Sequence, residues 1–220
     1  MIYFNMIIES LALFLKNYTE SENNLPKILI IGSSVAKGLG LRKSWAKQLT
    51  KNLIKHAYVT NLSIGGMNTS DALEQLNNVY DFYGKFDIVI VSLSLANEGF
   101  NDLIYRNYTR YEVINISHDY LLGINKIHEL IKKKEGIPII CSVYPNSNFD
   151  NYLHQQSLFV KETMKNKYDH FIDFYTNVHK DGKWDEKHIL DAGHPNNQGH
   201  KLMFEQIDID YLIKLINSLK

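Results

Sequence analysis

The 220-residue chain is predicted to fold as one α/β domain built on a doubly wound, five-stranded parallel sheet. Short apolar runs rich in β-branched residues alternate with longer segments of helical periodicity. Each apolar run is followed by a polar loop. Continuous apolar runs of this kind are typical of strands that are buried on both faces of a parallel sheet. With 45% hydrophobic and 22% charged residues, the chain can bury one sizeable core, and no stretch resembles a linker between two.

The first predicted strand is the apolar run over residues 29–31, which Gly32 ends. Ser33 and Ser34 follow at the carboxyl end of this strand, where open α/β sheets bind their ligands. A serine here is either a nucleophile or an ordinary helix N-cap. The loop glycines fit neither of the common phosphate-binding patterns, so a nucleotide site is not favoured.

The later elements are expected to repeat the order strand, loop, helix. Strands are predicted over 58–62, 86–93, 137–143 and 170–174, and helices over 44–56, from about 70, over 120–134, over 150–167 and from about 197. Residues 101–117 show no clear period, so we expect a long loop with short helical turns there.

The N-terminal residues 1–26 are predicted to form an amphipathic helix and a lead-in to the main domain over 27–220. The apolar stretch near the start follows no Lys or Arg, has no small-residue cleavage pattern and is too short to span a membrane. We therefore expect no membrane span and a cytoplasmic chain.

The composition argues against nucleic acid as a partner and against an internal disulfide. Lys plus Arg and Asp plus Glu number 24 each, so no global field favours nucleic acid. Cys141 is the only cysteine and cannot form an internal disulfide, so a buried structural thiol is expected.

Four loops carry residues suited to acyl transfer. Because the carboxyl ends of parallel strands share one edge, Ser34, Gly66, Asn97 and the segment 191–194 should converge. Acyl transfer needs a nucleophilic hydroxyl, an imidazole base, a carboxylate that orients the base, and donors for an oxyanion. Taken singly, each residue has a structural explanation as a cap, a turn residue or a flexible glycine. Their joint occurrence favours catalysis.

Two further histidines, His188 and His200, lie near His194 in the sequence. His188 is the main alternative for the base, because it lies close to His194 in sequence. His200 should lie within the final helical region and is expected to be structural or exposed.

The loops resemble the conserved blocks of the SGNH hydrolases, also called the GDSL-type esterase and lipase family. The blocks correspond, in order, to Gly32-Ser33-Ser34, to residues 64–68, to residues 95–98 and to Asp191-x-x-His194-Pro-Asn. The resemblance spans about residues 28–202 and implies a flavodoxin-like, three-layer α/β/α fold that hydrolyses esters through an acyl-enzyme.

By this resemblance, Ser34 would be the nucleophile, His194 the base and then the acid, and Asp191 the group that orients the imidazole. The oxyanion hole would consist of the backbone N–H groups of Ser34 and Gly66 and the side-chain amide of Asn97. The family implies no metal and no organic cofactor.

The chain departs from the family pattern at three positions. Ser33 stands where the family usually has aspartate, Leu95 where it has glycine, and Glu98 where it has aspartate. None of these removes a chemical group from the expected site, but they mark a divergent member.

The sequence thus predicts a serine esterase that acts on a small acyl ester, with an acetyl group on a carbohydrate as one candidate. An acyltransferase to a sugar hydroxyl and a non-catalytic binding module on the same fold remain as alternatives. The expected partner is a small-molecule or carbohydrate ester, and the oligomeric state stays open.

Overall fold

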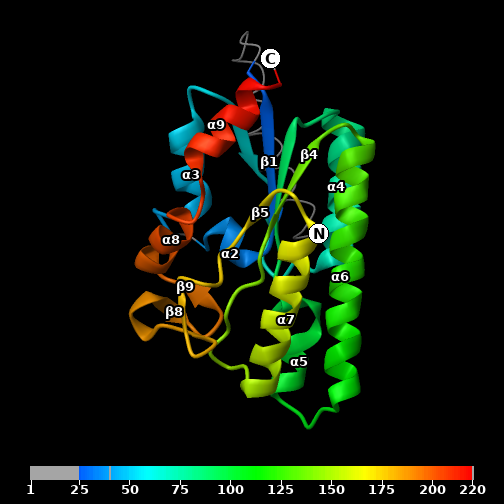
Figure 1. Ribbon diagram of the computed structural model, residues 1–220, viewed down its shortest axis with the longest axis vertical. Coiled ribbons are helices and arrows are strands. Elements are labelled where there is room, and N and C mark those ends of the chain that lie inside the picture. The colour runs from blue at the N-terminus through cyan, green and yellow to red at the C-terminus, as the bar shows by residue number, and fades with distance from the viewer. Residues whose placement is uncertain (1–24, 40, 220) are drawn as a thin grey trace.

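The computed structural model describes residues 25–39 and 41–219 (Figure 1). The amphipathic helix expected near the N-terminus lies outside these residues. Among the helices that are described, none combines the length and apolar character needed to cross a bilayer.

Five parallel strands form the sheet and pair in the order β2-β1-β3-β4-β5. They are β1 (Lys27–Gly32), β2 (Tyr58–Asn61), β3 (Ile88–Ser92), β4 (Ile137–Cys141) and β5 (Phe171–Ile172). This is the flavodoxin-like strand order, and it reverses direction between β1 and β3. The predicted fold class is therefore confirmed, and the reversal leaves a crevice position at the carboxyl edge beside β1.

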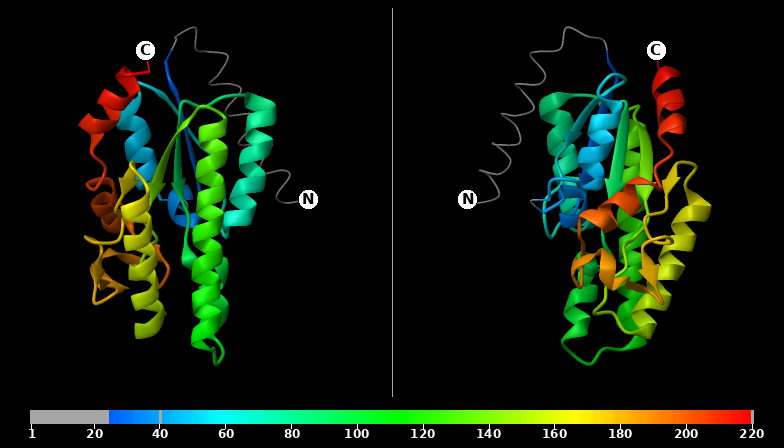
Figure 2. Two further views of the ribbon diagram at one scale, coloured as in Figure 1. Left: turned by 45° about the vertical axis from the view of Figure 1, so that its right-hand side comes forward. Right: turned by 90° about the vertical axis from the view of Figure 1, so that its left-hand side faces the viewer.

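Helices cover both faces of the sheet (Figures 1 and 2). One face carries α4 (Thr69–Tyr83), α6 (Arg110–Lys133) and α7 (Asn151–Lys167), and the other carries α3 (Trp45–Leu53), α8 (Asn197–Phe204) and α9 (Ile209–Asn217). The short helix α2 (Ser34–Lys37) follows β1 at the carboxyl edge. The molecule thus has three layers.

Two hydrophobic cores result from the alternation of side chains along each strand. In β1, Leu29 and Ile31 belong to the core under α4, α6 and α7, whereas Ile28 and Ile30 belong to the core under α3, α8 and α9. All four are fully buried. Because both faces are covered, the strand reads as a continuous apolar run instead of an alternating one.

The long loop expected over 101–117 is wrong in its extent. Residues Ala96–Phe100 form a π-helix (η1), Asn101–Ile104 form α5, and α6 already begins at Arg110. A capping box fixes this start, because Thr109 accepts a hydrogen bond from the N–H of Glu112 and the Glu112 carboxylate accepts one from the N–H of Thr109. The Thr-x-x-Glu spacing was the available signal.

The segment between β5 and the final helices contains short hairpins. The strands β6 (His179–Lys180) and β7 (Lys183–Trp184) form one, and β8 (Ile189–Asp191) and β9 (His194–Pro195) form the other, with the 3₁₀ turn η2 (Glu186–His188) between them. In the first hairpin, the Asp-Gly turn has positive φ at both residues, as two-residue hairpin turns prefer. Strands of two or three residues are too short to show a period.

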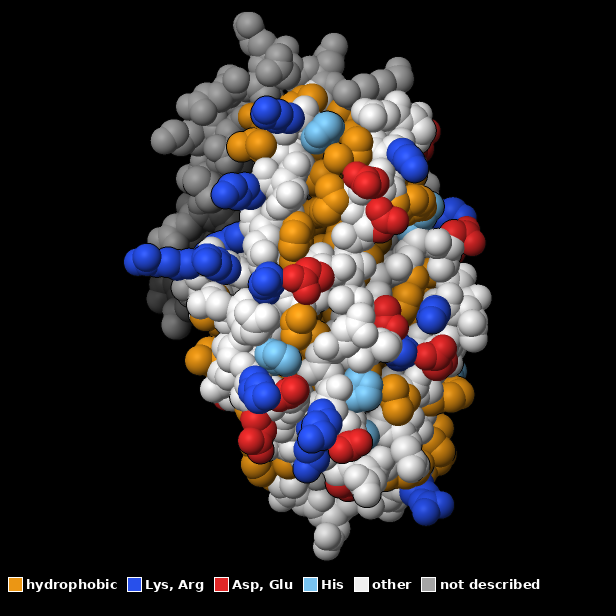
Figure 3. All heavy atoms as spheres, turned by 60° about the vertical axis from the view of Figure 1, so that its left-hand side comes forward, with side chains coloured by type: hydrophobic (Ala, Val, Ile, Leu, Met, Phe, Trp, Pro, Cys, Tyr) orange, Lys and Arg blue, Asp and Glu red, His pale blue; other side chains and the backbone are white. Residues whose placement is uncertain are grey.

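Charged side chains of both signs are interspersed over the face shown in Figure 3. This mixture agrees with the equal numbers of acidic and basic residues in the chain.

Candidate active site

Ser34 is the first residue of α2 and directly follows the turn after β1. A side chain at Gly32 is impossible, because its Cβ would lie 2.2 Å from the carbonyl oxygen of Ser92 in β3. The N–H of Ser33 donates to that same carbonyl over 3.1 Å. The turn therefore lies directly against β3. Ser33 is completely buried, and Ser34 is partly exposed.

Ser34, His194 and Asp191 form one continuous hydrogen-bonded chain. Ser34 Oγ lies 2.8 Å from His194 Nε2. On the other side of the ring, His194 Nδ1 lies 2.7 Å from Asp191 Oδ1 and 2.9 Å from Oδ2. Ser34 and His194 are 160 residues apart in sequence, whereas Asp191 and His194 belong to one segment.

A β-hairpin sets the geometry of the carboxylate and the imidazole. Asp191 in β8 pairs directly with His194 in β9, with an irregularity in β8 that allows the two side chains to face each other. Asn196 caps α8 and donates from its side-chain amide to the carbonyls of Lys187 and Ile189, over 2.9 and 3.2 Å. The pair is therefore held by a hairpin anchored to a helix start, and not by the helix cap itself.

Opposing effects act on the Asp191 carboxyl. Burial alone would raise its pKa, but the N–H of Gly193 at 2.9 Å and the His194 ring stabilise the charged form, and the pKa of Asp191 is lowered overall. An ionised Asp191 accepts a hydrogen bond from the N–H at Nδ1, which leaves Nε2 of a neutral His194 as an acceptor toward Ser34. Such an arrangement can remove the proton of Ser34.

Gly66 and Asn97 belong to two loops that are joined to each other. The Gly66 backbone has φ +80°, a conformation that favours glycine. Its neighbour Gly65 faces Ser34, since a Cβ built on Gly65 would lie 3.8 Å from Ser34 Cβ. Asn97, in η1, donates from Nδ2 to the carbonyl of Met67 over 3.2 Å. The glycine loop thus connects Ser34 with Asn97.

Glu98 of η1 makes a further contact, with Thr69 at the start of α4. Its carboxylate accepts hydrogen bonds from the N–H of Thr69 at 2.9 Å and from the Thr69 hydroxyl at 2.5 Å. Burial raises the pKa of the Glu98 carboxyl, although the bonds from Thr69 oppose this shift. The sequence alone marks Glu98 only as a departure from the family pattern, because its partner Thr69 lies 29 residues away.

His188 is the first of the two alternative histidines, and its Nδ1 is buried without a hydrogen-bond partner among the described residues. Asp185 precedes His188 by three residues, as Asp191 precedes His194, so spacing alone does not separate the two. Asp185 instead caps η2 through the N–H of Lys187, over 3.1 Å. Of the histidines in the described residues, only His194 is hydrogen-bonded to Ser34.

His200 lies inside α8 and is buried. Its Nδ1 accepts the N–H of Trp45 over 3.3 Å, and burial lowers the pKa of His200 to about 4. It is therefore neutral at ordinary pH and anchors α8 to α3. Within residues 25–39 and 41–219, no three His, Cys, Asp or Glu side chains are grouped so that they could hold a metal ion.

The sheet order and the helical layers define a three-layer α/β/α hydrolase fold. A model of the GDSL-like lipase/acylhydrolase family matches residues 30–202. The chain therefore belongs to the GDSL-like lipase/acylhydrolase family, as its motifs predicted. A comparison with curated protein sequences finds no match.

Solved structures share the whole fold at low identity. A GDSL-like lipase from Bacteroides thetaiotaomicron VPI-5482 aligns with a TM-score of 0.64 and 15% identity, over 93% of this chain and 97% of the other. The psychrotrophic esterase EstA from Pseudoalteromonas sp. gives 0.60 and 18%, over 87% and 98%. The acetyl xylan esterase AlAXEase gives 0.61 and 13%, over 82% and 96%.

Proposed function

We propose that this protein is a serine esterase that hydrolyses a small acyl ester through an acyl-enzyme. The observation that carries the proposal is the unbroken chain from Ser34 Oγ through the His194 ring to Asp191, with 2.8 and 2.7 Å contacts. Membership of an acylhydrolase family supports it. The structural likeness to an acetyl xylan esterase favours an acetyl group on a carbohydrate as the first ester to test.

In the first half-reaction, Ser34 Oγ attacks the carbonyl carbon of the ester while its proton passes to His194 Nε2. Asp191 stabilises the imidazolium that forms. The carbonyl oxygen becomes an oxyanion and accepts hydrogen bonds from the N–H groups of Ser34 and Gly66 and from the amide of Asn97. When the tetrahedral intermediate collapses, the bond to the alcohol oxygen breaks, and His194 gives its proton to that oxygen.

The second half-reaction repeats these steps with water. His194 takes a proton from a water molecule, whose oxygen attacks the acyl carbon bound to Ser34. The collapse of the second intermediate breaks the bond to Ser34 Oγ, which regains its proton from His194, and releases the carboxylic acid. Both steps use the same oxyanion donors, so one arrangement serves the whole cycle.

The test is a panel of p-nitrophenyl acetate, butyrate and octanoate, with acetylated sugars alongside. We expect turnover that is fastest on short acyl chains, labelling of Ser34 by a fluorophosphonate probe, and loss of both in Ser34→Ala. Ser218→Ala, which changes an exposed serine at the end of α9, is the matched control. A folded protein that hydrolyses none of these esters and leaves Ser34 unlabelled would overturn the proposal.

A further inference from the structure

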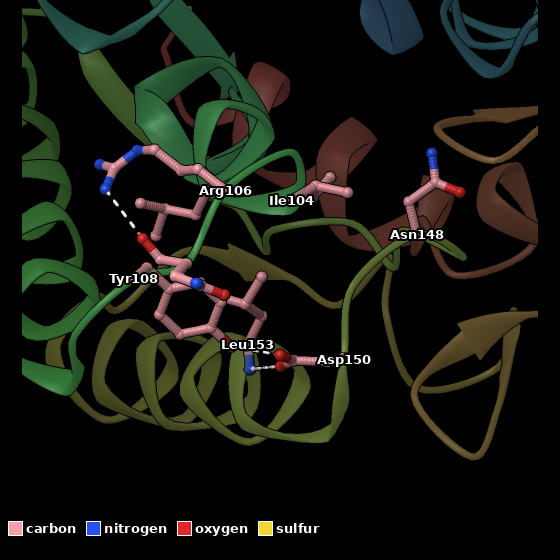
Figure 4. Close-up of a pocket in the computed structure, with 8 residues that line it drawn as sticks. Ile104, Arg106, Tyr108, Asn148, Asp150 and Leu153 are labelled. Carbon is pink, nitrogen blue, oxygen red and sulfur yellow. Dashed lines mark hydrogen bonds between the residues drawn. The ribbon is translucent and has the colours of Figure 1, made fainter.

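A cavity of about 490 Å³ opens between α5, the loop before α6 and the start of α7 (Figure 4). Its lining includes Ile104, Arg106, Asn107, Tyr108, Asn148 and Asp150. None of these residues belongs to the Ser34–His194–Asp191 chain. The volume falls within the range of about 300 to 1,000 Å³ typical of small-molecule sites and far exceeds the needs of an acetyl group.

Both walls of the cavity are joined to segments of the proposed site. On one side, α5 follows η1, the segment that carries Asn97. On the other side, the N–H of Ser147 donates over 2.8 Å to the carbonyl of Ala192, which lies between Asp191 and His194. One wall is thus continuous in sequence with the element that carries the proposed oxyanion donor, and the segment just before Asn148 in the other wall is hydrogen-bonded to the hairpin that carries the proposed base.

The charged groups at the cavity already have partners. Arg106 forms an ion pair with Glu112 at 2.7 Å, and its guanidinium lies on the far side from Asn148 in Figure 4. The Asp150 carboxylate accepts the N–H groups of Tyr152 and Leu153, at 2.9 and 3.0 Å, and the hydroxyl of Tyr108. A ligand therefore meets no uncommitted charge, which favours a neutral molecule.

Two polar groups at the cavity are available to a ligand. The side-chain amides of Asn107 and Asn148 are exposed and make no hydrogen bond in the part of the chain that the structure describes. An amide both donates and accepts, as a sugar hydroxyl does. Ile104 adds an apolar wall against which the C–H face of a sugar ring can pack.

We infer that this cavity binds the neutral, hydroxyl-rich alcohol part of the ester, an oligosaccharide unit, while the acyl group faces Ser34. The inference rests on the proposed esterase function. A long acyl chain is disfavoured, because it would cover the two amides without pairing them, and unpaired polar groups are costly to desolvate. Asn107 and Asn148 are thus specificity-determining residues for the leaving alcohol.

The experiment compares p-nitrophenyl acetate with an acetylated disaccharide, such as acetylated xylobiose or cellobiose. For the double variant Asn107→Ala/Asn148→Ala, we expect the ratio of kcat/KM on the disaccharide to kcat/KM on p-nitrophenyl acetate to fall about tenfold, mainly through KM, since two neutral hydrogen bonds are lost. Asn78→Ala, an exposed asparagine on α4 outside the cavity lining, is the control and should leave the ratio unchanged.

Binding without chemistry gives the second measurement. Ser34→Ala titrated with unesterified xylotriose or cellotriose should show NMR shifts in the Asn107 and Asn148 side-chain amides. An unchanged ratio in the double variant, no shifts with either sugar, or a ratio that falls instead for p-nitrophenyl octanoate would each overturn the inference. Hydrolysis of p-nitrophenyl acetate in the same assays keeps these outcomes separate from a failure of the esterase proposal.

Discussion

The carboxylate of Glu98 accepts both the N–H and the hydroxyl of Thr69, over 2.9 and 2.5 Å. The preceding residue, Asn97, donates to the carbonyl of Met67 over 3.2 Å. Two consecutive residues of η1 are therefore tied to the loop that carries Gly66 and to the start of α4. Because oxyanion donors act best when their positions are fixed before the reaction, we expect this clamp to make Glu98 a positioning residue for the proposed donors Asn97 and Gly66.

Replacing Glu98 tests this role. Glu98→Gln keeps the size of the side chain but weakens one of its two hydrogen bonds to Thr69, so the donors lose their fixed spacing. We expect kcat on p-nitrophenyl acetate to fall about tenfold with KM nearly unchanged, as for the loss of one charge-assisted hydrogen bond. Glu74→Gln, an exposed residue on α4, is the control. A lower melting temperature with normal kcat would contradict the positioning role and would indicate that Glu98 only stabilises the start of α4.

Ser33 and Ser34 should respond in opposite ways to replacement by alanine. Ser33 is fully buried, and its hydroxyl has no hydrogen-bond partner in the described part of the chain. Ser33→Ala should therefore keep most activity and gain up to about 1 kcal/mol in stability, since an unpaired buried hydroxyl is removed. Ser34→Ala should lose turnover while folding normally. Probe labelling that moves to Ser33 would contradict this assignment.

The Asp191→Asn variant should fold normally, and its kcat should be about 10³- to 10⁴-fold lower than that of the unchanged protein. An amide in place of the carboxylate no longer stabilises the imidazolium and can hold the His194 ring in the wrong tautomer. Asp185→Asn is the matched control, because Asp185 stands three residues before His188 and caps η2. Similar losses in both variants would indicate that the assay reports folding of this region and not the role of Asp191.

A partly buried ion pair under α7 should contribute to stability in acid. Lys161 Nζ lies 3.2 Å from Asp173 Oδ2, 3.0 Å from Glu162 Oε1 and 2.9 Å from the Thr176 hydroxyl. Burial alone would raise the pKa of Asp173, but bonds from Thr176 and the charge of Lys161 lower it overall. The stabilisation is therefore complete above the unfolded value of about 3.9 and is lost as the pH falls through the lower folded pKa.

Urea denaturation of Asp173→Asn measures this contribution. At pH 7, the variant should be less stable by up to about 3 kcal/mol, because Lys161 keeps only Glu162 as a charged partner. Its stability should also depend less on pH below about 5 than that of the unchanged protein. Equal slopes in the two proteins would show that other carboxylates control the acid transition.

The sequence predicted the strands that carry the site because buried parallel strands are long enough to show an apolar run, as residues 29–31 do. It did not predict the hairpin of β8 and β9, since three-residue strands have no measurable period. The contact between Glu98 and Thr69 also escaped prediction, because it depends on how η1 lies against α4. The start of α6, by contrast, is marked in the sequence by the Thr-x-x-Glu spacing of the Thr109–Glu112 capping box.

Asn97 offers the sharpest distinction between an enzyme and a protein that only resembles one. If its amide donates to the developing oxyanion, the bond strengthens as charge appears, so its loss should act on kcat more than on KM. Asn97→Ala should lower kcat by about a hundredfold or more, which corresponds to roughly 3 kcal/mol, and keep KM within a few-fold. Asn97→Asp, of the same shape, should lower kcat at least as far, because a carboxylate repels the oxyanion. If Asn97 only ties η1 to Met67, both changes would lower the melting temperature and leave kcat per folded molecule nearly intact. Melting temperature and kcat measured on one preparation of each variant decide between the two roles.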